Sequence, residues 1–300
     1  MSGLTVIILT FNSEGSILEV LDSLKSLATH VLIVDSGSSD QTVQLVRERK
    51  CDLVSHPFEN YAQQRNFAQE EAKSRYALQA TDWVLHLDSD EVLSPELALS
   101  IEGALQRNDT SMYGYLMRRL PYFMDQPIRF GHLNPNWHLR LFRIGHGECE
   151  NRLYDQHFLV NGMTTKLQGL LLDKPKVNIE RWTATHNRWS TAEAEEAYSL
   201  FDSLQVSENK NTLPASLSGD LRMKKRWLKN NVWYRLPLFS RAFFFFFYSY
   251  FIRLGFLDGR VGLVYCVLQA FWFRFLVDAK IMEHQLDIKR NRVNAGMKSG

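Results

Sequence analysis

The stretch WVLHLDSDE, residues 83–91, places an apolar run directly before three carboxylates in four residues. The run has the length and composition of a strand that is buried on both faces of a sheet. Crowded carboxylates repel one another, so this strand end predicts either a positive partner or full solvation by water.

Apolar runs alternate with helical patterns upstream of this stretch. LTVIILT (4–10), HVLIVD (30–35) and CDLVSH (51–56) predict three further buried strands, and a long helix is expected from about residue 62 to 80. This alternation predicts a parallel, doubly wound α/β sheet. The polar motifs TFNSE, DSGSSD and DSDE each follow a strand, at the edge where such sheets bind ligands.

The second half of the chain reads differently. An irregular pattern of strands is expected over 112–189 and a helix over 190–210. The net charge of +2 conceals a split, because residues 222–300 carry 15 Lys and Arg against 4 Asp and Glu. The three cysteines lie far apart, which disfavours a disulfide framework and favours a reducing compartment.

Asp88 and Asp90 are two residues apart, so their side chains project to the same side of an extended chain. Two carboxylates that converge on a loop are suited to Mg²⁺ or Mn²⁺, which would take further oxygens from a substrate phosphate. The alternative is a solvated helix N-terminus, where acidic side chains favour the helix dipole. We assign Glu91 and Glu96 to that alternative.

Three motifs in order and at fitting spacing, VIILTFNSEGSILEVLDSL, VLIVDSGSSDQT and WVLHLDSDE, resemble the nucleotide-binding half of family 2 glycosyltransferases of the GT-A fold over residues 4–100. The resemblance implies that two strand ends hold the nucleoside and that Asp35 accepts hydrogen bonds from it. It also implies a nucleotide-side Arg and a metal that bridges the diphosphate. The residues carried over are Thr10, Phe11, Asn12, Glu14, Asp35, Arg65, Asp88 and Ser89 for the nucleotide, and Asp88 and Asp90 for the metal.

The chemistry of the residues agrees with this resemblance. Transfer from a nucleoside-diphosphate sugar requires the departing diphosphate to be neutralised, which a divalent cation does without moving protons. The sequence holds no Gly-rich phosphate loop and no G-x-G-x-x-G, which points away from kinases and dehydrogenases.

An inverting transfer also needs a general base for the acceptor hydroxyl. In this family the resemblance implies an Asp or Glu from the second half, and ENRLYDQHF places Asp155 among apolar residues that would raise its pKa. We therefore predict Asp155 as the base, with His157 able to orient the acceptor or share the role. The other candidates are Asp125, Glu148, Glu150 and Asp173.

Two further segments resemble parts of the acceptor side. NPNWHLRLFR contributes Trp137, His138, Arg140 and Arg143, and the absence of Gln-x-x-Arg-Trp favours the addition of a single sugar. In THNRWS, His186 and Arg188 would clamp phosphate or complete the metal site, whereas simple packing of Trp189 is the competing interpretation.

The tail predicts membrane association. Residues 222–241 hold seven basic residues and no acidic one, with Trp227, Trp233 and Tyr234 interleaved among them. This pattern is typical of an interfacial helix on anionic lipid. The apolar stretches that follow, 242–252 and 253–277, are interrupted by arginines and suit a helical hairpin in one leaflet better than a full span. Nucleic-acid binding would explain the charge but not the five consecutive Phe, and a plain packed helical pair is the third interpretation.

The tail segment GFLDGRVGLVYCVLQAFWFRF, with the core motifs, resembles the lipopolysaccharide-core β-glucosyltransferases. We therefore predict a GT-A domain, with a Rossmann-like, mostly parallel sheet flanked by helices, over residues 1–210, and a membrane-associating helical tail over 211–300. The predicted enzyme is peripheral or monotopic at the cytoplasmic face of the inner membrane and does not bind nucleic acid. It would transfer one sugar from a nucleotide sugar, UDP-linked by preference, to a lipid-linked or lipopolysaccharide-type glycan acceptor.

Two alternatives stay open. A nucleotidyltransferase would also use paired carboxylates and a metal, although the usual Gly-rich, basic loop after the first strand is missing. A non-catalytic membrane adaptor would keep the fold without turnover.

Overall fold

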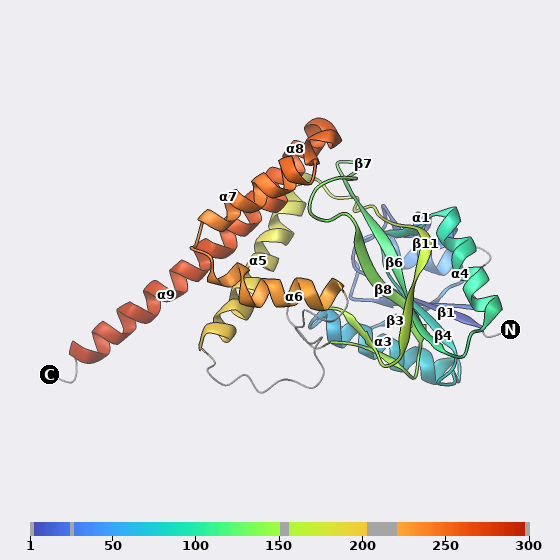
Figure 1. The fold of residues 1–300 in the computed structure, drawn as a ribbon. Coiled ribbons are helices and arrows are strands. Elements are labelled where there is room, and N and C mark those ends of the chain that lie inside the picture. The colour runs from blue at the N-terminus through green and yellow to red at the C-terminus, as the bar shows by residue number, and fades with distance from the viewer. Residues whose placement is uncertain (1–2, 25–26, 151–155, 203–220, 298–300) are drawn as a thin grey trace. The chain divides into compact units, whose positions relative to one another are not determined.

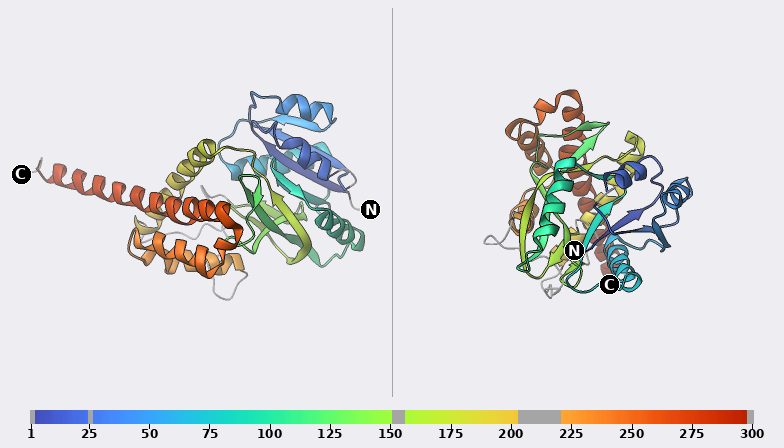
Figure 2. Two further views of the ribbon diagram at one scale, coloured as in Figure 1. Left: turned by 90° about the horizontal axis from the view of Figure 1, so that it is seen from above. Right: turned by 90° about the vertical axis from the view of Figure 1, so that its right-hand side faces the viewer.

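The computed structural model describes residues 3–24, 27–150, 156–202 and 221–297. Within them a nine-stranded mixed sheet carries helices on both faces (Figure 1, Figure 2). Across the sheet the strands are β3 (Asp52–Ser55), β2 (His30–Asp35), β1 (Leu4–Thr10), β4 (Trp83–Asp88), β8 (Asn136–Arg143), β6 (Met112–Phe123), β11 (Met163–Asp173) and β5 (Glu91–Leu93), with β7 (Gln126–Pro127) paired to β6. A separate ribbon pairs β9 (Gly147–Cys149) with β10 (Phe158–Val160).

The four strands β1 to β4 confirm the predicted doubly wound half, because all of them run parallel. The other half is mixed: β8 runs antiparallel to both β4 and β6, while β6 and β11 are parallel. Antiparallel β8 brings residues from beyond position 136 alongside β4, so side chains distant in sequence meet the acidic strand end.

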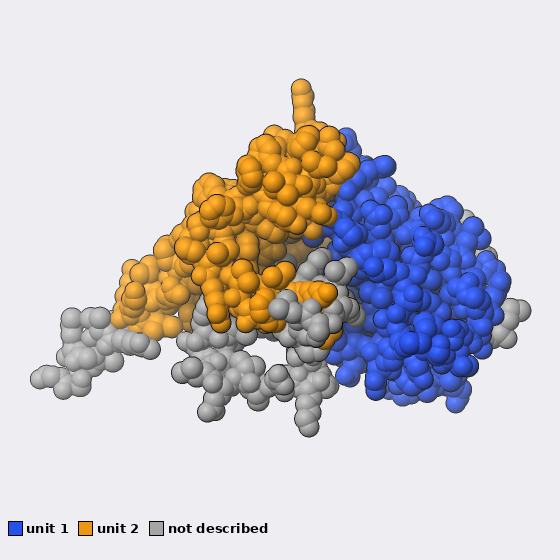
Figure 3. Space-filling model, in the orientation of Figure 1, with its two compact units in different colours: residues 1–129, 133–176 blue, residues 130–132, 177–300 orange. Residues whose placement is uncertain are grey.

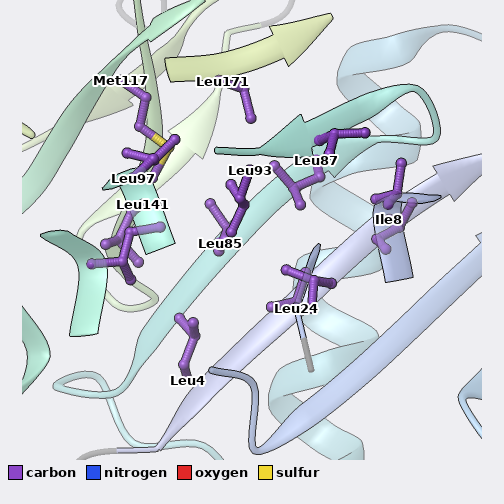
Figure 4. Close-up of a cluster of buried hydrophobic side chains, with 14 of the residues drawn as sticks. Leu4, Ile8, Leu24, Leu85, Leu87, Leu93, Leu97, Met117, Leu141 and Leu171 are labelled. Atoms are coloured by element: carbon purple, nitrogen blue, oxygen red, sulfur yellow. The ribbon is translucent and has the colours of Figure 1, made fainter. Parts of the chain in front are cut away.

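Successive residues of β1 face two separate cores, as the period of a strand requires. Val6 and Ile8 pack on the face covered by α1 (Ile17–Ser23), α2 (Thr42–Glu48) and α4 (Pro95–Arg107), where Figure 4 shows the leucines of several strands converging. Ile7 packs on the opposite face, under α3 (Tyr61–Arg75). Each buried side chain of this size contributes about 1.5–3 kcal/mol, so both faces fix the strand in place.

Two predicted helix limits were wrong. Helix α3 ends at Arg75 instead of about 80, because the chain turns through a left-handed residue at Ala77. Helix α5 (Ile179–Asp202) begins eleven residues before the predicted start at 190. Aromatic and polar residues alternate at its start, which hid the helical period there.

The chain divides into two compact units, coloured separately in Figure 3. Unit 1 comprises residues 1–129 and 133–176, and unit 2 comprises 130–132 and 177–300. The predicted domain limit at 210 lies outside the described residues, and the predicted domain assignment stays a prediction.

Unit 2 is helical. Within it, α5 packs on α9, and the buried Arg241 guanidinium donates from Nε to Asp278 over 2.7 Å. One helical path among the described residues, Gly255–Asn291, is long and apolar enough to cross a membrane by length and composition, whereas the sequence favoured two interrupted stretches. The elements of unit 2 that follow α5 are α6 (Leu221–Asn231), η1 (Trp233–Arg235), α7 (Ser240–Phe247), η2 (Tyr248–Ile252), η3 (Gly255–Asp258), α8 (Gly259–Tyr265), η4 (Cys266–Trp272) and α9 (Phe273–Met297).

A three-residue piece of the chain between β7 and β8 belongs to this helical unit. The Phe130 N–H donates to the Asp258 carboxylate over 2.9 Å, and the Gly131 N–H donates to the Arg253 carbonyl, also over 2.9 Å. His132 contacts the Ser249 hydroxyl through both its backbone N–H and its ring. We call residues 130–132 the anchored loop.

Candidate functional site

The predicted polar motifs do meet at one edge of the sheet. Thr10 lies opposite Asp35 in the pairing of β1 with β2, and Leu9 lies opposite Asp88 in the pairing of β1 with β4. Because these strands are parallel, their carboxyl ends and the loops that follow share one edge.

Asp35 organises the loop that follows β2. Its Oδ1 accepts hydrogen bonds from the hydroxyls of Thr10, over 3.0 Å, and Ser38, over 2.5 Å. Its Oδ2 accepts the backbone N–H groups of Gly37 and Ser38 at 3.0 and 2.8 Å. Both oxygens are therefore engaged within the protein, and the predicted contact of Asp35 with the nucleoside stays a prediction.

The first loop is joined to the second by side-chain bonds. Asn12, in the left-handed region with φ 48°, accepts the Ser39 N–H at its Oδ1 over 2.8 Å. The Glu14 carboxylate accepts the Gln41 N–H over 2.9 Å. Phe11 projects outward between them, with 54% of its surface exposed. The loops thus form a braced rim with one exposed aromatic ring.

The turn after β4 is tied to the same rim. The hydroxyls of Ser13 and Ser89 lie 2.7 Å apart, which links the loop after β1 to the predicted nucleotide residue Ser89. Ser13 was not among the predicted nucleotide residues. Its position between Asn12 and Glu14 in TFNSE is the sequence signal that would have included it.

Arginines offset the crowded carboxylates. Asp88 accepts from Arg65 at Oδ1 over 2.9 Å and from Arg140 at Oδ2 over 2.7 Å. Arg140 also binds Glu91 over 2.7 Å, and Arg119 lies between Glu91, at 3.3 Å, and Asp173, at 2.8 Å. We call the four carboxylates and three arginines the acidic cluster: Asp88, Asp90, Glu91, Asp173, Arg65, Arg119 and Arg140.

Glu91 was assigned wrongly to a solvated helix end. It is fully buried in β5, where its Oε2 accepts the Asp88 N–H over 3.0 Å. The helix begins later, with Ser94 as N-cap and Pro95 at its first position. Glu96, exposed in the first turn of α4, confirms the other half of that prediction.

The two predicted metal ligands have opposite electrostatic surroundings. Burial alone would raise the pKa of the Asp88 carboxyl, but Arg140 and Arg65 outweigh burial and hold this pKa well below its usual range. Burial and then the negative charge of Asp173 and Asp88 raise the pKa of Asp90 well above its usual value. No described residue donates a hydrogen bond to the half-buried carboxylate of Asp90.

This donor set fits a divalent cation in one respect. Asp90 is a carboxylate surrounded by negative charge, which a cation would relieve, whereas both oxygens of Asp88 already accept arginine hydrogen bonds. The described residues contain no group of three or more His, Cys, Asp or Glu side chains arranged to hold a metal. A metal here would therefore complete its shell with substrate oxygens and water.

The predicted acceptor segments separate into different places. Asp155, the predicted base, lies outside the described residues. Arg140 is buried in the acidic cluster. Arg143 lies at the other end of β4, with its guanidinium 4.5 Å from the Trp83 ring. The Lys166 ammonium lies 4.6 Å from the ring of Trp137.

THNRWS lies inside α5 of the helical unit. His186 stacks on Trp182 with ring centroids 3.4 Å apart, and its Nδ1 donates to the Trp182 carbonyl. Burial lowers the pKa of His186 to about 4. The competing interpretation of this segment as packing is therefore the one that the structure supports.

A parallel α/β half with braced loops and an acidic cluster beyond its fourth strand defines the GT-A class of glycosyltransferases. The model of Glycosyl transferase family 2 matches residues 5–158, and the chain belongs to this family of enzymes.

Curated relatives agree with the family. An uncharacterized glycosyltransferase of Rickettsia felis is 26% identical over 96% of this chain and 93% of its own length. The lipopolysaccharide core biosynthesis glycosyltransferase LpsC of Rhizobium meliloti is 24% identical over 64% of this chain and 71% of its own length. A solved structure of glucosyl-3-phosphoglycerate synthase from Mycobacterium tuberculosis, with Mn²⁺ and UDP, is 13% identical and covers 67% of this chain and 79% of its own. The TM-score between the two structures is 0.40.

Proposed function

We propose that this glycosyltransferase transfers a sugar from a nucleoside diphosphate, UDP by preference, with Mg²⁺ or Mn²⁺ held at Asp90. One observation carries the proposal: each other carboxylate of the acidic cluster contacts an arginine, whereas the side-chain carboxylate of Asp90 accepts no hydrogen bond from a described residue. A cation at this position would neutralise the diphosphate as it departs.

The braced rim supports the nucleoside part of this proposal. The exposed ring of Phe11 is suited to stack on a base, and Asn12 and Glu14 lie in the same loop. We propose that Asp35, Arg65 and Ser89 hold these loops in position for the nucleoside through the bonds described above.

In the proposed reaction, an acceptor hydroxyl oxygen attacks the anomeric carbon, whose bond to the diphosphate oxygen breaks with inversion. The diphosphate leaves with the electron pair, and a base takes the hydroxyl proton. Asp155 is the base predicted from the sequence. If Asp155→Asn retains near-normal turnover, Glu150 or His157 is the base instead.

A thermal-shift screen tests the donor. UDP-, GDP- and dTDP-sugars, each with and without Mn²⁺, should reveal one donor that raises Tm in a Mn²⁺-dependent way. Release of UDP in the presence of a bacterial envelope-lipid extract would support transfer. Release of pyrophosphate would indicate a nucleotidyltransferase instead. No turnover with any donor would favour the non-catalytic membrane adaptor.

We also propose that unit 2 binds an anionic membrane surface, with a lipid-linked glycan as acceptor and the cytoplasmic face of the inner membrane as the location. Aromatic and aliphatic side chains are exposed along α7, η2 and η3, and basic residues flank these elements in the sequence. Large exposed apolar patches rimmed by polar residues mark interaction sites. The exposed set includes Phe243, Phe244, Phe247, Tyr248, Phe251, Ile252, Phe256 and Leu257.

Vesicle flotation tests the membrane proposal. The full chain should float with vesicles that contain anionic lipid, more weakly at high salt, and Phe244→Glu should reduce flotation. Leu99→Glu is the matched control, because Leu99 is 69% exposed on α4, outside the tail. Equal loss in both variants, or no flotation of the wild type at low salt, would contradict the proposal.

A further inference from the structure

A buried carboxylate and an imidazole are paired where the β9–β10 ribbon opens. The Glu150 side chain is fully buried, and its Oε1 accepts the backbone N–H of His157 over 2.9 Å. The same oxygen lies 3.1 Å from Nδ1 of the His157 ring. In return, the Glu150 N–H donates to the His157 carbonyl over 3.0 Å. Three contacts therefore fix the position and the rotation of one ring.

This arrangement also selects a tautomer. A carboxylate can only accept, so Nδ1 carries the proton that it directs at Glu150. The lone pair of the neutral imidazole then resides on Nε2. Because the Glu150 side chain is shielded from water, no solvent competes for its contact with Nδ1.

The pair lies beside the acidic cluster. Phe158, the next residue, has its ring 5.6 Å from the Arg65 guanidinium, and Arg65 binds Asp88. His138 of β8 interacts electrostatically with His157 and also with Arg119 and Arg140 of the cluster. The His157 side chain keeps 19% of its surface exposed, whereas that of Glu150 is fully buried.

We propose that His157 is a catalytic residue of the transfer and that Glu150 is its positioning residue. This rests on the proposed function. As the acceptor oxygen bonds to the anomeric carbon and the diphosphate leaves with its electron pair, the hydroxyl proton passes to Nε2. The resulting imidazolium is held against Glu150 and then releases the proton to water.

The sequence left this role with Asp155 and kept His157 as a partner. The structure adds the hydrogen-bond acceptor for Nδ1 of His157, which is the buried carboxylate of Glu150. The two residues are seven positions apart, and a sequence pattern does not show that the ribbon brings them together. A carboxylate that holds an imidazole in one tautomer is the arrangement that general-base histidines require.

The test compares four variants of the full chain with the donor selected by the thermal-shift screen, Mn²⁺ and an envelope-lipid extract. His157→Ala should lower kcat by roughly 10²–10⁴-fold, with KM for the donor and the donor-induced rise in Tm unchanged. Added imidazole should restore part of the kcat of this variant, which a purely structural role would not allow. Glu150→Gln should lower kcat less, by about 10-fold, because the amide oxygen still accepts from Nδ1.

His146→Asn is the matched control, since His146 lies beside the same ribbon and this variant is expected to keep wild-type kcat. Near wild-type kcat in His157→Ala, or a loss that imidazole does not rescue in a variant with wild-type Tm, would overturn the proposal. The proposal would also be overturned if Asp155→Asn abolished turnover while His157→Ala kept it. That result would leave the proposed function intact. A wild type that is silent with every donor would overturn both.

Discussion

The two units handle buried charge in different ways. In unit 2, Asp278 is paired with Arg241, and Glu193 contacts Arg274 at 2.8 Å and Lys229 at 2.9 Å. In unit 1, three arginines bind three carboxylates of the acidic cluster and leave a fourth carboxylate without a described donor.

This difference separates structural charge from functional charge. A fully paired buried ion pair can often be replaced by apolar residues at little cost in stability. A carboxylate kept among like charges costs stability, and it persists where a ligand supplies the missing cation. Asp90 is the group that the comparison singles out.

The largest expected effect comes from removing that charge. Asp90→Asn should lower transfer by at least about 10²-fold, because the proposed cation loses its protein ligand. The rise in Tm that Mn²⁺ and donor give together should also disappear. Glu96→Gln, exposed on α4, is the control and should change neither measurement. Donor affinity that stays Mn²⁺-dependent in Asp90→Asn would contradict the metal assignment.

Breaking the paired part of the acidic cluster should mainly affect folding. Arg140→Met removes a guanidinium that contacts both Asp88 and Glu91, so it leaves excess negative charge buried in the cluster. We expect the free energy of unfolding to fall by about 3–5 kcal/mol. Urea denaturation measures this loss. Arg140→Lys should recover part of it, and full stability in Arg140→Met would show that the cluster is not held by this guanidinium.

The dependence of stability on pH tests whether His186 is buried as a neutral imidazole. Since the pKa of His186 falls to about 4 on folding, the unfolded chain binds more protons between pH 6.5 and 4. Stability should therefore fall as pH drops through this window, by up to about 3 kcal/mol from this group. His186→Phe keeps a ring on Trp182 and should flatten that part of the curve. Identical pH profiles of wild type and variant would contradict the assignment.

The smallest net effect is expected from a double change in unit 2. Arg241→Met alone should cost about 3–5 kcal/mol, because it leaves Asp278 buried without its cation. Arg241→Met with Asp278→Leu should recover most of this loss, although the Phe239 N–H then loses its acceptor. Transfer per folded molecule should stay unchanged. A double variant as unstable as the single one would remove the distinction between the two units.

The sequence predicted the parallel half and its edge because each of those strands is a short β-branched run followed by turn residues. Local pattern also placed Asp88 and Asp90 correctly at a strand end. It failed at Glu91 because SDEVLSPE contains a helix start, and only the later Ser94–Pro95 pair marks where that start lies.

The arginine partners could not be predicted from spacing. Arg119 and Arg140 reach the cluster through β6 and β8, and the order of these strands in the sheet follows from antiparallel pairing that no local pattern records. From the sequence, Arg140 fitted a contact with the acceptor equally well. Glu150 was a candidate base in the sequence, but its contact with His157 depends on how the ribbon closes.

The anchored loop has a mechanical consequence. Because residues 130–132 are held in the helical unit, the polypeptide passes between the units three times, at 129/130, 132/133 and 176/177. The two units are therefore joined by three backbone connections instead of one. Cutting the chain before residue 222 would strip this loop of Ser249 and Asp258, so the catalytic half cannot be isolated without disturbing the lead into β8.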